Sequence, residues 1–294
     1  SAPIVIQGHM KEEAGNAYQN LTASGIAITV YATQYEYEYD SFNNTYDKDA
    51  PMATDAQRAE LAKMLANAGE NAVVELGAMN YGNFTLSSGA YSYDYPKNLT
   101  LVGQEGTMFT GFAISDEVIT NWTFKDITFM ANGKEDAGNT DGFHATTKAV
   151  IDGLTFENCT FVKGATLTMI KTSGDAFKNV TVKNCTFTDV DVIRDSKGGA
   201  SPAILMQGVN NGTVSGCTFT NAGYNALQTN QMTGTWTIEK NTITNTNDRA
   251  IRLANTGADV TLSCNAVVSH GDADGELFTI YGDVQVASYN DYAN

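Results

Sequence analysis

The residues best suited to chemistry are basic side chains in two parts of the sequence. Arg249 and Arg252 lie close together, and Arg194 lies in a stretch rich in charge at residues 190–200. Polysaccharide lyases need a base, often Arg or Lys, and a cation or an acid that neutralises the carboxylate of a uronic acid. A lyase is therefore one candidate activity. The ligand-binding candidates beside these residues are Asp195, Lys197 and Asp248, and the same face could hold Asp191 and His144.

The same charges have a second interpretation. Alternation around the apolar residues Ile251 and Leu253 turns Arg252 toward solvent. There Asp248 can form a salt bridge with Arg249 or Arg252, and a solvated strand face of this kind performs no chemistry. Both interpretations stay open, and we favour the solvated face.

A candidate carboxylate lies in a different motif. Residues 139–142 read Asn-Thr-Asp-Gly and resemble the motif of polygalacturonase-type glycoside hydrolases in which the Asp is one of three catalytic carboxylates. The resemblance implies a catalytic role for Asp141. In an enzyme of either kind, a lyase or a hydrolase, the further working groups would be His144, Arg194, Arg249 and Arg252. Where that family has an adjacent Asp pair, residues 164–167 read Gly-Ala-Thr-Leu, and its Gly-His-Gly and Arg-Ile-Lys motifs are absent. Because glycoside hydrolysis normally needs a second carboxylate near the same bond, we expect Asp141 to serve turn geometry.

A metal site has one candidate in the sequence. Asp272, Asp274 and Glu276 belong to an Asp-Ala-Asp-Gly-Glu stretch whose carboxylates could bind Ca²⁺. The stretch lacks the remaining ligands of a complete calcium loop, so a plain acidic turn is the alternative that we favour. No cofactor is otherwise indicated, because His9 and His270 are far from His144 and no Cys/His spacing typical of a metal site is present.

An internal repeat must position all of these residues. Segments that begin with Thr recur 32, 26, 32, 24 and 24 residues apart, which indicates a solenoid turn of about 24 residues with loops inserted in some turns. The aligned segments are residues 123–129, 155–161, 181–187, 213–219, 237–243 and 261–267.

The aligned positions of the repeat explain its geometry. The second and seventh positions are always apolar, yet they are five residues apart, and strict strand alternation would not bury both. The fourth position holds Asp126, Asn158, Asn184 and Gly216, which tolerate the left-handed backbone region. A tight corner there turns both apolar positions inward. The many Asn-x-Thr matches are interpreted in the same way, as a corner Asn followed by a strand Thr, at Asn98, Asn121, Asn158, Asn184 and Asn211.

A third strand precedes each pair, for example at residues 143–145, 203–206 and 250–253. Three strands per turn predict an all-β protein, a right-handed parallel β-helix with at least six rungs between Val73 and Val286. A β-sandwich is the alternative, but it would need hairpins every 8–12 residues and would not preserve the aligned positions.

The cysteines follow the same repeat. Cys159, Cys185 and Cys217 share the fifth position, and Cys264 lies one place out of register. A buried stack of free thiols is the interpretation that we favour over a disulfide.

The start of the β-helix is also predicted. Thr54 or Asp55 can cap a helix at about residues 54–68, with Leu61, Met64, Leu65 and Ala68 on one face and Gly69 as its end. A short amphipathic helix covers the open end of a solenoid. This stretch, with the first strand and the rungs, resembles the pectate-lyase-like β-helix superfamily over about residues 54–286. That resemblance specifies fold far better than function.

Residues 1–53 differ in kind from the rest of the chain. They contain two strand-like runs, and the second alternates aliphatic residues with a stripe of tyrosines. Residues 9–20 and 30–34 look like the last strands of the camelysin/TasA-like family of exported bacterial β-sandwich proteins, which are linked to biofilm matrix. We therefore expect an N-terminal β-hairpin-like extension at residues 1–53, as a fragment of a sandwich or packed on the β-helix at residues 54–294.

The amino-acid composition limits the classes of molecule that the protein can bind. Lys and Arg total 17 against 33 acidic residues, for a net charge of −16. This charge argues against nucleic acid, anionic lipid and polyuronates without a bridging cation. No run approaches the roughly 18 apolar residues needed to cross a membrane, and no signal peptide is apparent. We expect a secreted or cell-surface protein that is either a non-catalytic adhesin for an extracellular glycan or a host or matrix protein, or a polysaccharide lyase or glycoside hydrolase.

Overall fold

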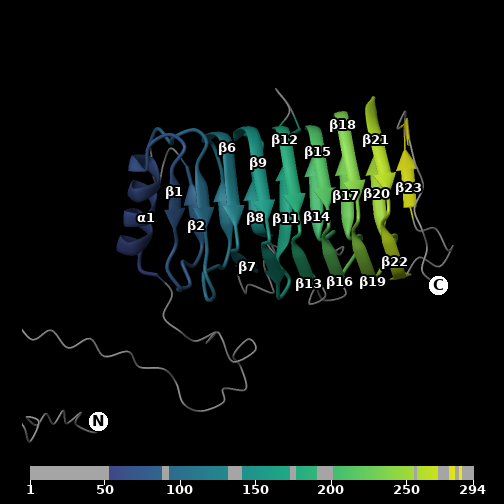
Figure 1. The fold of residues 1–294 in the computed structure, drawn as a ribbon, viewed down its shortest axis with the longest axis horizontal. Coiled ribbons are helices and arrows are strands. Elements are labelled where there is room, and N and C mark those ends of the chain that lie inside the picture. Colours follow the sequence, from purple (N-terminus) through teal and green to yellow (C-terminus); the bar gives the residue numbers. More distant parts are fainter. Residues whose placement is uncertain are drawn as a thin grey trace, which may run out of the picture. The chain divides into compact units, whose positions relative to one another are not determined.

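The structure, a computed structural model, describes residues 53–87, 93–131, 141–172, 177–190, 201–254, 257–270, 278–281 and 285–286. Within these residues one helix, α1 (Asp55–Asn67), is followed by strands that form three parallel sheets of nine, seven and eight strands. Each turn of the chain adds one strand to each sheet, so like strands stack along one axis (Figure 1). This is the predicted right-handed parallel β-helix with three strands per turn.

The strands of each sheet follow in order along the axis. The nine-stranded sheet contains β1 (Val73–Glu75), β3 (Thr100–Val102), β6 (Val118–Lys125), β9 (Val150–Glu157), β12 (Phe177–Lys183), β15 (Val209–Ser215), β18 (Thr233–Glu239), β21 (Ala258–Ser263) and β24 (Gln285–Val286). The seven-stranded sheet contains β4 (Met108–Phe109), β7 (Thr128–Met130), β10 (Thr160–Val162), β13 (Thr186–Val190), β16 (Thr218–Ala222), β19 (Thr242–Thr246) and β22 (Ala266–His270). The eight-stranded sheet contains β2 (Phe84–Leu86), β5 (Phe112–Ile114), β8 (Asp141–Ala145), β11 (Thr166–Ile170), β14 (Ile204–Gln207), β17 (Leu227–Asn230), β20 (Ile251–Ala254) and β23 (Phe278–Tyr281).

The predicted corner lies between the nine-stranded and seven-stranded sheets. Asp126, Asn158 and Asn184 have φ values of 55°, 53° and 53°, and Gly216 has 64°. Asn side chains tolerate this left-handed region because they hydrogen-bond locally. All five Asn residues of the Asn-x-Thr matches have positive φ. The corner interpretation is confirmed for Asn158 and Asn184, whereas Asn121 and Asn211 lie within β6 and β15. Cys264, with φ 53°, occupies the corner position of its rung, which explains why it is out of register with the other cysteines.

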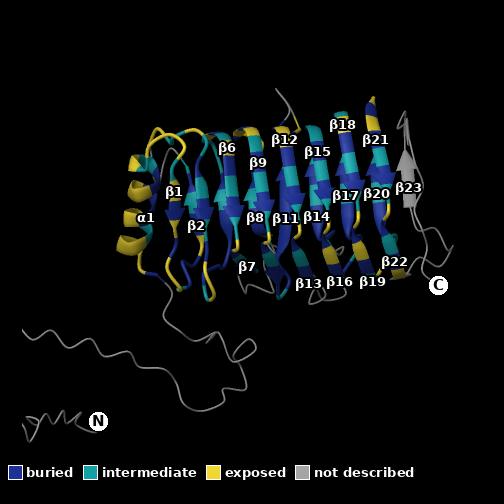
Figure 2. Ribbon diagram, in the orientation of Figure 1, coloured by how far each residue is buried: buried dark blue, intermediate teal, exposed yellow. Residues whose placement is uncertain are grey.

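The core is a stack of like side chains. Phe129, Phe161, Phe187 and Phe219 are buried behind the seven-stranded sheet, and successive rings lie 4.9, 4.5 and 4.9 Å apart at 19°, 8° and 11°. The alternation of buried and half-exposed residues along the strands is visible in Figure 2. Near-parallel rings at this spacing require rungs that repeat almost by translation.

The fifth position of the repeat is buried throughout. The three aligned cysteines are free thiols, as predicted. In the next two rungs Asn241 and Asn265 replace them, and Asn241 Nδ2 donates to Asn265 Oδ1 at 2.8 Å. Asn241 Oδ1 accepts from the backbone of Cys217 at 2.9 Å, so the amide ladder joins the end of the thiol stack.

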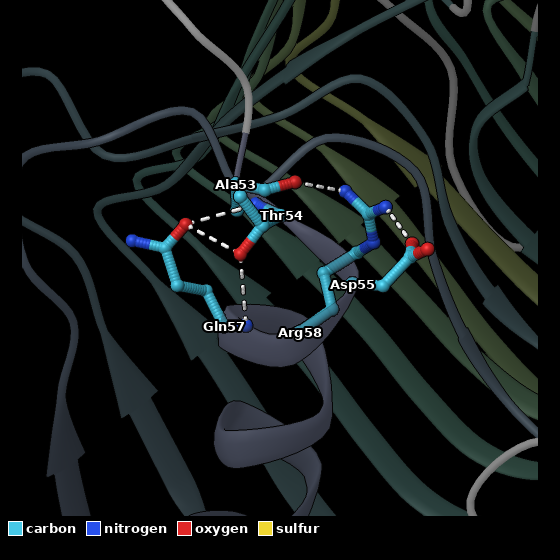
Figure 3. A network of polar contacts seen from close by, with 5 residues as sticks. All are labelled: Ala53, Thr54, Asp55, Gln57 and Arg58. Carbon is cyan, nitrogen blue, oxygen red and sulfur yellow. Dashed lines mark hydrogen bonds and ion pairs between the residues drawn. The ribbon is translucent and has the colours of Figure 1, made fainter.

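Helix α1 lies at one end of the stack (Figure 1). Thr54 is its N-cap and forms a capping box with Gln57, while Arg58 contacts Asp55 and the carbonyl of Ala53 (Figure 3). Such a cap contributes about 1 kcal/mol.

The buried face of the helix differs from the prediction at one residue. Leu61, Ala62 and Leu65 are buried, whereas Met64 is 41% exposed, so the buried face is turned toward Ala62 and away from Met64. The expected stop is present, since Gly69 follows the helix with φ 83°. No helix among the described residues is long and apolar enough to span a membrane.

Candidate functional site

Asp141 and His144 meet on the outer face of the eight-stranded sheet. Both belong to β8, and Asp141 Oδ2 lies 2.6 Å from His144 Nδ1. The other oxygen, Oδ1, accepts a hydrogen bond from Thr166 Oγ1 of β11 at 2.9 Å, and the Thr166 and Thr168 hydroxyls lie 3.1 Å apart. The register shifts between Thr166 and Leu167, which brings the Thr166 hydroxyl opposite Asp141. The carboxylate thus joins two neighbouring strands.

The charge of Asp141 is stabilised by these contacts. Burial raises the pKa of this carboxyl, but hydrogen bonds from His144, Thr168 and Thr166 outweigh burial and leave the pKa below its ordinary value. An ionised carboxylate on Nδ1 orients the imidazole and leaves Nε2 on the side away from Asp141. Asp141 is therefore suited to hold His144 in place and poorly suited to donate a proton near neutral pH.

No partner carboxylate comes from the neighbouring positions. Gly164 forms a turn with φ 87°, and Ala165 is fully buried against Gly142, where an added Cβ would lie 2.7 Å from the Ala165 Cβ. These residues occupy the place of the Asp pair in polygalacturonase-type enzymes. The described residues at this place cannot supply the two-carboxylate arrangement of glycoside hydrolysis.

Arg252 shares an outward column with His144. In register along the eight-stranded sheet, this column contains Thr85, Ala113, His144, Thr168, Leu205, Gln228 and Arg252. The predicted outward direction of Arg252 is confirmed, because Ile251 and Leu253 are buried on either side of it. Yet β8 and β20 are separated by three strands, and four steps of strand spacing place the two side chains about 19 Å apart. They share a face and do not converge on one bond.

Arg249 and Asp248 lie in the turn before β20. Arg249 Nη1 is 3.5 Å from Asp248 Oδ1, the local salt bridge that the sequence analysis expected. Asn225 Nδ2 donates to Asp248 Oδ2 at 3.2 Å and to the Arg249 carbonyl at 2.7 Å. Burial and the neighbouring Asp248 raise the pKa of Tyr224, against smaller opposing effects of Arg252 and Arg249. Within this turn, the charged groups of Asp248 and Arg249 thus interact with each other.

Several predicted residues lie outside the described part of the chain. They are Asp191, Arg194, Asp195, Lys197, Asp272, Asp274 and Glu276, together with the N-terminal extension at residues 1–52. Their proposed roles stay predictions. Among the residues that the structure does describe, no group of three or more His, Cys, Asp or Glu side chains is placed to hold a metal ion.

A groove that was not predicted from the sequence lies at the corner between the nine-stranded and seven-stranded sheets. This corner groove has a volume of 470 Å³ and is lined by residues 103–106, Met108, residues 126–128, Asn158 and Thr160. A second groove, of 480 Å³, lies between α1 and β1 and includes Lys63, Met64 and Val73. Neither groove includes His144 or Arg252.

The register contains the feature that marks the corner groove. Val102 pairs with Lys125 and Met108 pairs with Thr128, so residues 103–107 take the place that residues 126–127 fill in the next rung. A Gly-Gln-Glu-Gly stretch after an apolar Thr-Leu-Val strand could have predicted a wide turn.

Of the comparisons with known proteins, the match to a family model bears on the architecture. No curated protein matches the chain. Among solved structures, it is similar to the ORF18 protein of Geobacillus virus E2, with 11% sequence identity and a TM-score of 0.46, over 81% of this chain and 58% of that protein. The chain thus spans little more than half of the length of that protein. The family model described as "Right handed beta helix region" matches residues 111–291, more than half of the sequence. The chain belongs to this family of right-handed β-helix proteins.

Proposed function

We propose that this β-helix is a non-catalytic binding module of a secreted or cell-surface bacterial protein, with an extracellular glycan or a host or matrix protein as its ligand. One observation carries the proposal. On the face where β-helix enzymes place their clefts, the described charged residues form local contacts, Asp141 with His144 and Asp248 with Arg249. Because His144 and Arg252 lie about 19 Å apart, they do not form one catalytic centre.

Two features of the sequence support an extracellular role. Residues 9–20 and 30–34 resemble the exported camelysin/TasA-like proteins, and the rungs resemble pectate-lyase-like β-helices. A net charge of −16 favours ligands without negative charge. Neutral glycans and protein surfaces satisfy that condition.

The test is a panel of neutral and acidic polysaccharides and matrix proteins, with and without calcium. Binding is measured by depletion from solution, and turnover by new reducing ends or by the absorbance of unsaturated products. We expect binding without turnover. Failure to bind any glycan or matrix protein would contradict the adhesin proposal.

A carbohydrate-active enzyme, either a polysaccharide lyase or a glycoside hydrolase, is the second candidate. The 2.6 Å contact between Asp141 and His144 favours it, because a carboxylate that orients an imidazole is a common way to prepare a general base. Arg194, Arg249 and Arg252 are then the further candidate residues. If the panel reveals turnover, His144→Gln should abolish it while the unfolding midpoint stays unchanged, and a fully active variant would exclude this site.

A further inference from the structure

We propose that the corner groove is the site that binds an extended neutral polysaccharide, which continues from the groove along the outer face of the seven-stranded sheet. This inference rests on the proposed function, because it names the ligand class and the surface of that same binding module.

The wide turn at residues 103–107 builds one wall of the groove. The turn is braced from within, because Thr107 Oγ1 donates to the Gly77 carbonyl at 2.9 Å and accepts from the backbone of Gln104 at 2.9 Å. Gly103 lies directly on the next corner, where a Cβ would come within 2.3 Å of the Asp126 carbonyl oxygen. The absence of a side chain at Gly103 therefore lets the turn lie against the rung below it.

The opposite wall of the groove is formed by the corner residues of the next two rungs, Asp126 and Asn158. Asp126 Oδ1 accepts a hydrogen bond from Asn158 Nδ2 at 3.1 Å, so the two side chains hold each other in a defined position. Thr128 and Thr160 follow these corners and add their hydroxyls to the lining. The walls thus come from three successive rungs.

The lining indicates the class of ligand. It contains the carboxylates of Glu105 and Asp126, the amides of Gln104 and Asn158, threonine hydroxyls and no basic side chain. Carboxylates accept strong hydrogen bonds from hydroxyl groups, whereas they repel uronic acids and sulfated sugars. A volume of 470 Å³ is in the range of small-molecule sites. A neutral polyhydroxylated unit satisfies both the charge and the size.

A regular column of hydroxyls leads out of the groove. In register with Thr128 and Thr160, the threonine column of the seven-stranded sheet continues through Thr186, Thr218 and Thr242. Strand spacing places these residues about 4.8 Å apart, which is close to the length of one sugar residue in an extended chain. One sugar per rung would meet the same hydroxyl and methyl group at each step.

Outward strand positions do not require threonine in general. Threonine is favoured on strands, yet the outward column of the eight-stranded sheet includes His144, Leu205 and Arg252 in place of a uniform series. The threonine column is also backed by the stacked Phe side chains, which keep its spacing regular. Groove and column together form a continuous, hydroxyl-rich track, with the carboxylates of Glu105 and Asp126 in the pocket at one end.

The first experiment uses the full chain and a length series of neutral oligosaccharides derived from cellulose, xylan, mannan and chitin. Affinity is measured by titration calorimetry. For the sugar that binds, affinity should rise with each added residue up to about five, the length of the column, and then level off. Acidic oligouronates should not compete.

The second experiment locates the site with matched variants. The groove pair Thr128→Val and Thr160→Val removes two hydroxyls at constant shape. The control pair Thr123→Val and Thr155→Val makes the same change in the same rungs, on the nine-stranded sheet and outside the groove lining. The groove pair should lose roughly tenfold or more in affinity for every oligosaccharide length, and the control pair should stay within about twofold of the parent.

A third pair tests the direction of the track. Thr218→Val with Thr242→Val should weaken only oligosaccharides long enough to reach those rungs, and should leave the shortest binders unchanged. Equal unfolding midpoints establish that all variants are folded.

The outcomes separate this inference from the proposed function. If the parent binds a glycan but the groove and control pairs bind equally well, the groove is not the site while the binding function stands. Equal losses in both pairs, or selective binding of polyuronates, also overturn the assignment. If the parent binds only a matrix protein, the module binds but the polysaccharide assignment fails. If it binds neither a glycan nor a matrix protein, the proposed function fails with it.

Discussion

Two outer faces of the same β-helix differ in how uniform their outward-facing side chains are from rung to rung. On the nine-stranded sheet one outward column is threonine in seven successive strands, at Thr100, Thr123, Thr155, Thr181, Thr213, Thr237 and Thr261. On the eight-stranded sheet the comparable column changes its chemistry at almost every rung. A uniform column offers a ligand the same contact at each step, whereas a varied column can build only a compact site. Both threonine columns, on the nine-stranded and the seven-stranded sheet, meet this condition for a polymer, but only the column of the seven-stranded sheet also borders the corner groove. The varied column suits a local group such as the Asp141–His144 pair.

The largest expected effect tests whether the uniform faces depend on the core behind them. Phe187→Ala removes a fully stacked ring between Phe161 and Phe219 and should lower the free energy of unfolding by about 3–5 kcal/mol. Met206→Ala, behind the eight-stranded sheet, should cost about 2–5 kcal/mol. Urea denaturation measures both. A negligible loss in Phe187→Ala would contradict a core held by ring stacking.

We expect substitutions at the corner to change the stability of the protein mainly through the backbone conformation that they allow, and less through side-chain contacts. Asn184→Ala places a Cβ without local hydrogen bonding at φ 53° and should destabilise the protein by about 1–2 kcal/mol. Asn184→Gly, which accepts this φ freely, should lose clearly less. The ratio of the two losses, from urea midpoints, decides the point, and equal losses would show that the amide contacts dominate.

The varied face should depend on pH. Because the folded-state pKa of Asp141 lies below its ordinary value of 3.8, its ionised form adds stability above about pH 4, and this contribution is lost as the pH falls through the lowered pKa. Asp141→Asn should remove this part of the acid dependence. Thermal midpoints between pH 2 and 6 measure it, with Asp259→Asn as the control on an exposed carboxylate of the nine-stranded sheet. Identical acid profiles for all three proteins would refute the assignment.

The smallest effect concerns the uniform surface itself. Thr213→Val on the nine-stranded sheet should change the free energy of unfolding by no more than about 0.5 kcal/mol, since valine, like threonine, has a high strand propensity. Gln228→Val gives the comparison on the eight-stranded sheet. A large loss for Thr213→Val alone would mean that the threonine column stabilises the fold and is not merely a surface.

The sequence predicts most of this fold because a β-helix repeats its constraints. Each rung repeats the same pattern, a corner residue such as Asn158 or Asn184 with apolar positions on either side. A misaligned rung would therefore bury polar residues. The inward side of α1 was less predictable, since Ala62 and Met64 lie on opposite sides of the Leu61 and Leu65 stripe and only packing against the first rung decides which side is buried.

The sites were harder to predict than the fold for a physical reason. The sites depend on local interruptions of the repeat, and the aligned segments of the other rungs do not predict where such an interruption occurs. The wide turn at Gly103 and the register shift at Thr166 interrupt the repeat locally, and their partners Asp126 and Asp141 belong to other rungs. That His144 and Arg252 share a face was predictable from strand alternation. Their separation required the strand order along the axis.

The corner position of Cys264 makes the protein easy to label at one place. Burial and hydrogen bonding between Cys159, Cys185 and Cys217 raise the pKa values of the Cys185 and Cys217 thiols, which keeps them protonated and slow toward electrophiles. Cys264 is exposed on the outside of the same stack. A maleimide dye or a surface tether should therefore attach to the folded chain at this single thiol, near the far end of the solenoid from α1, and would allow the β-helix to be immobilised in a known direction.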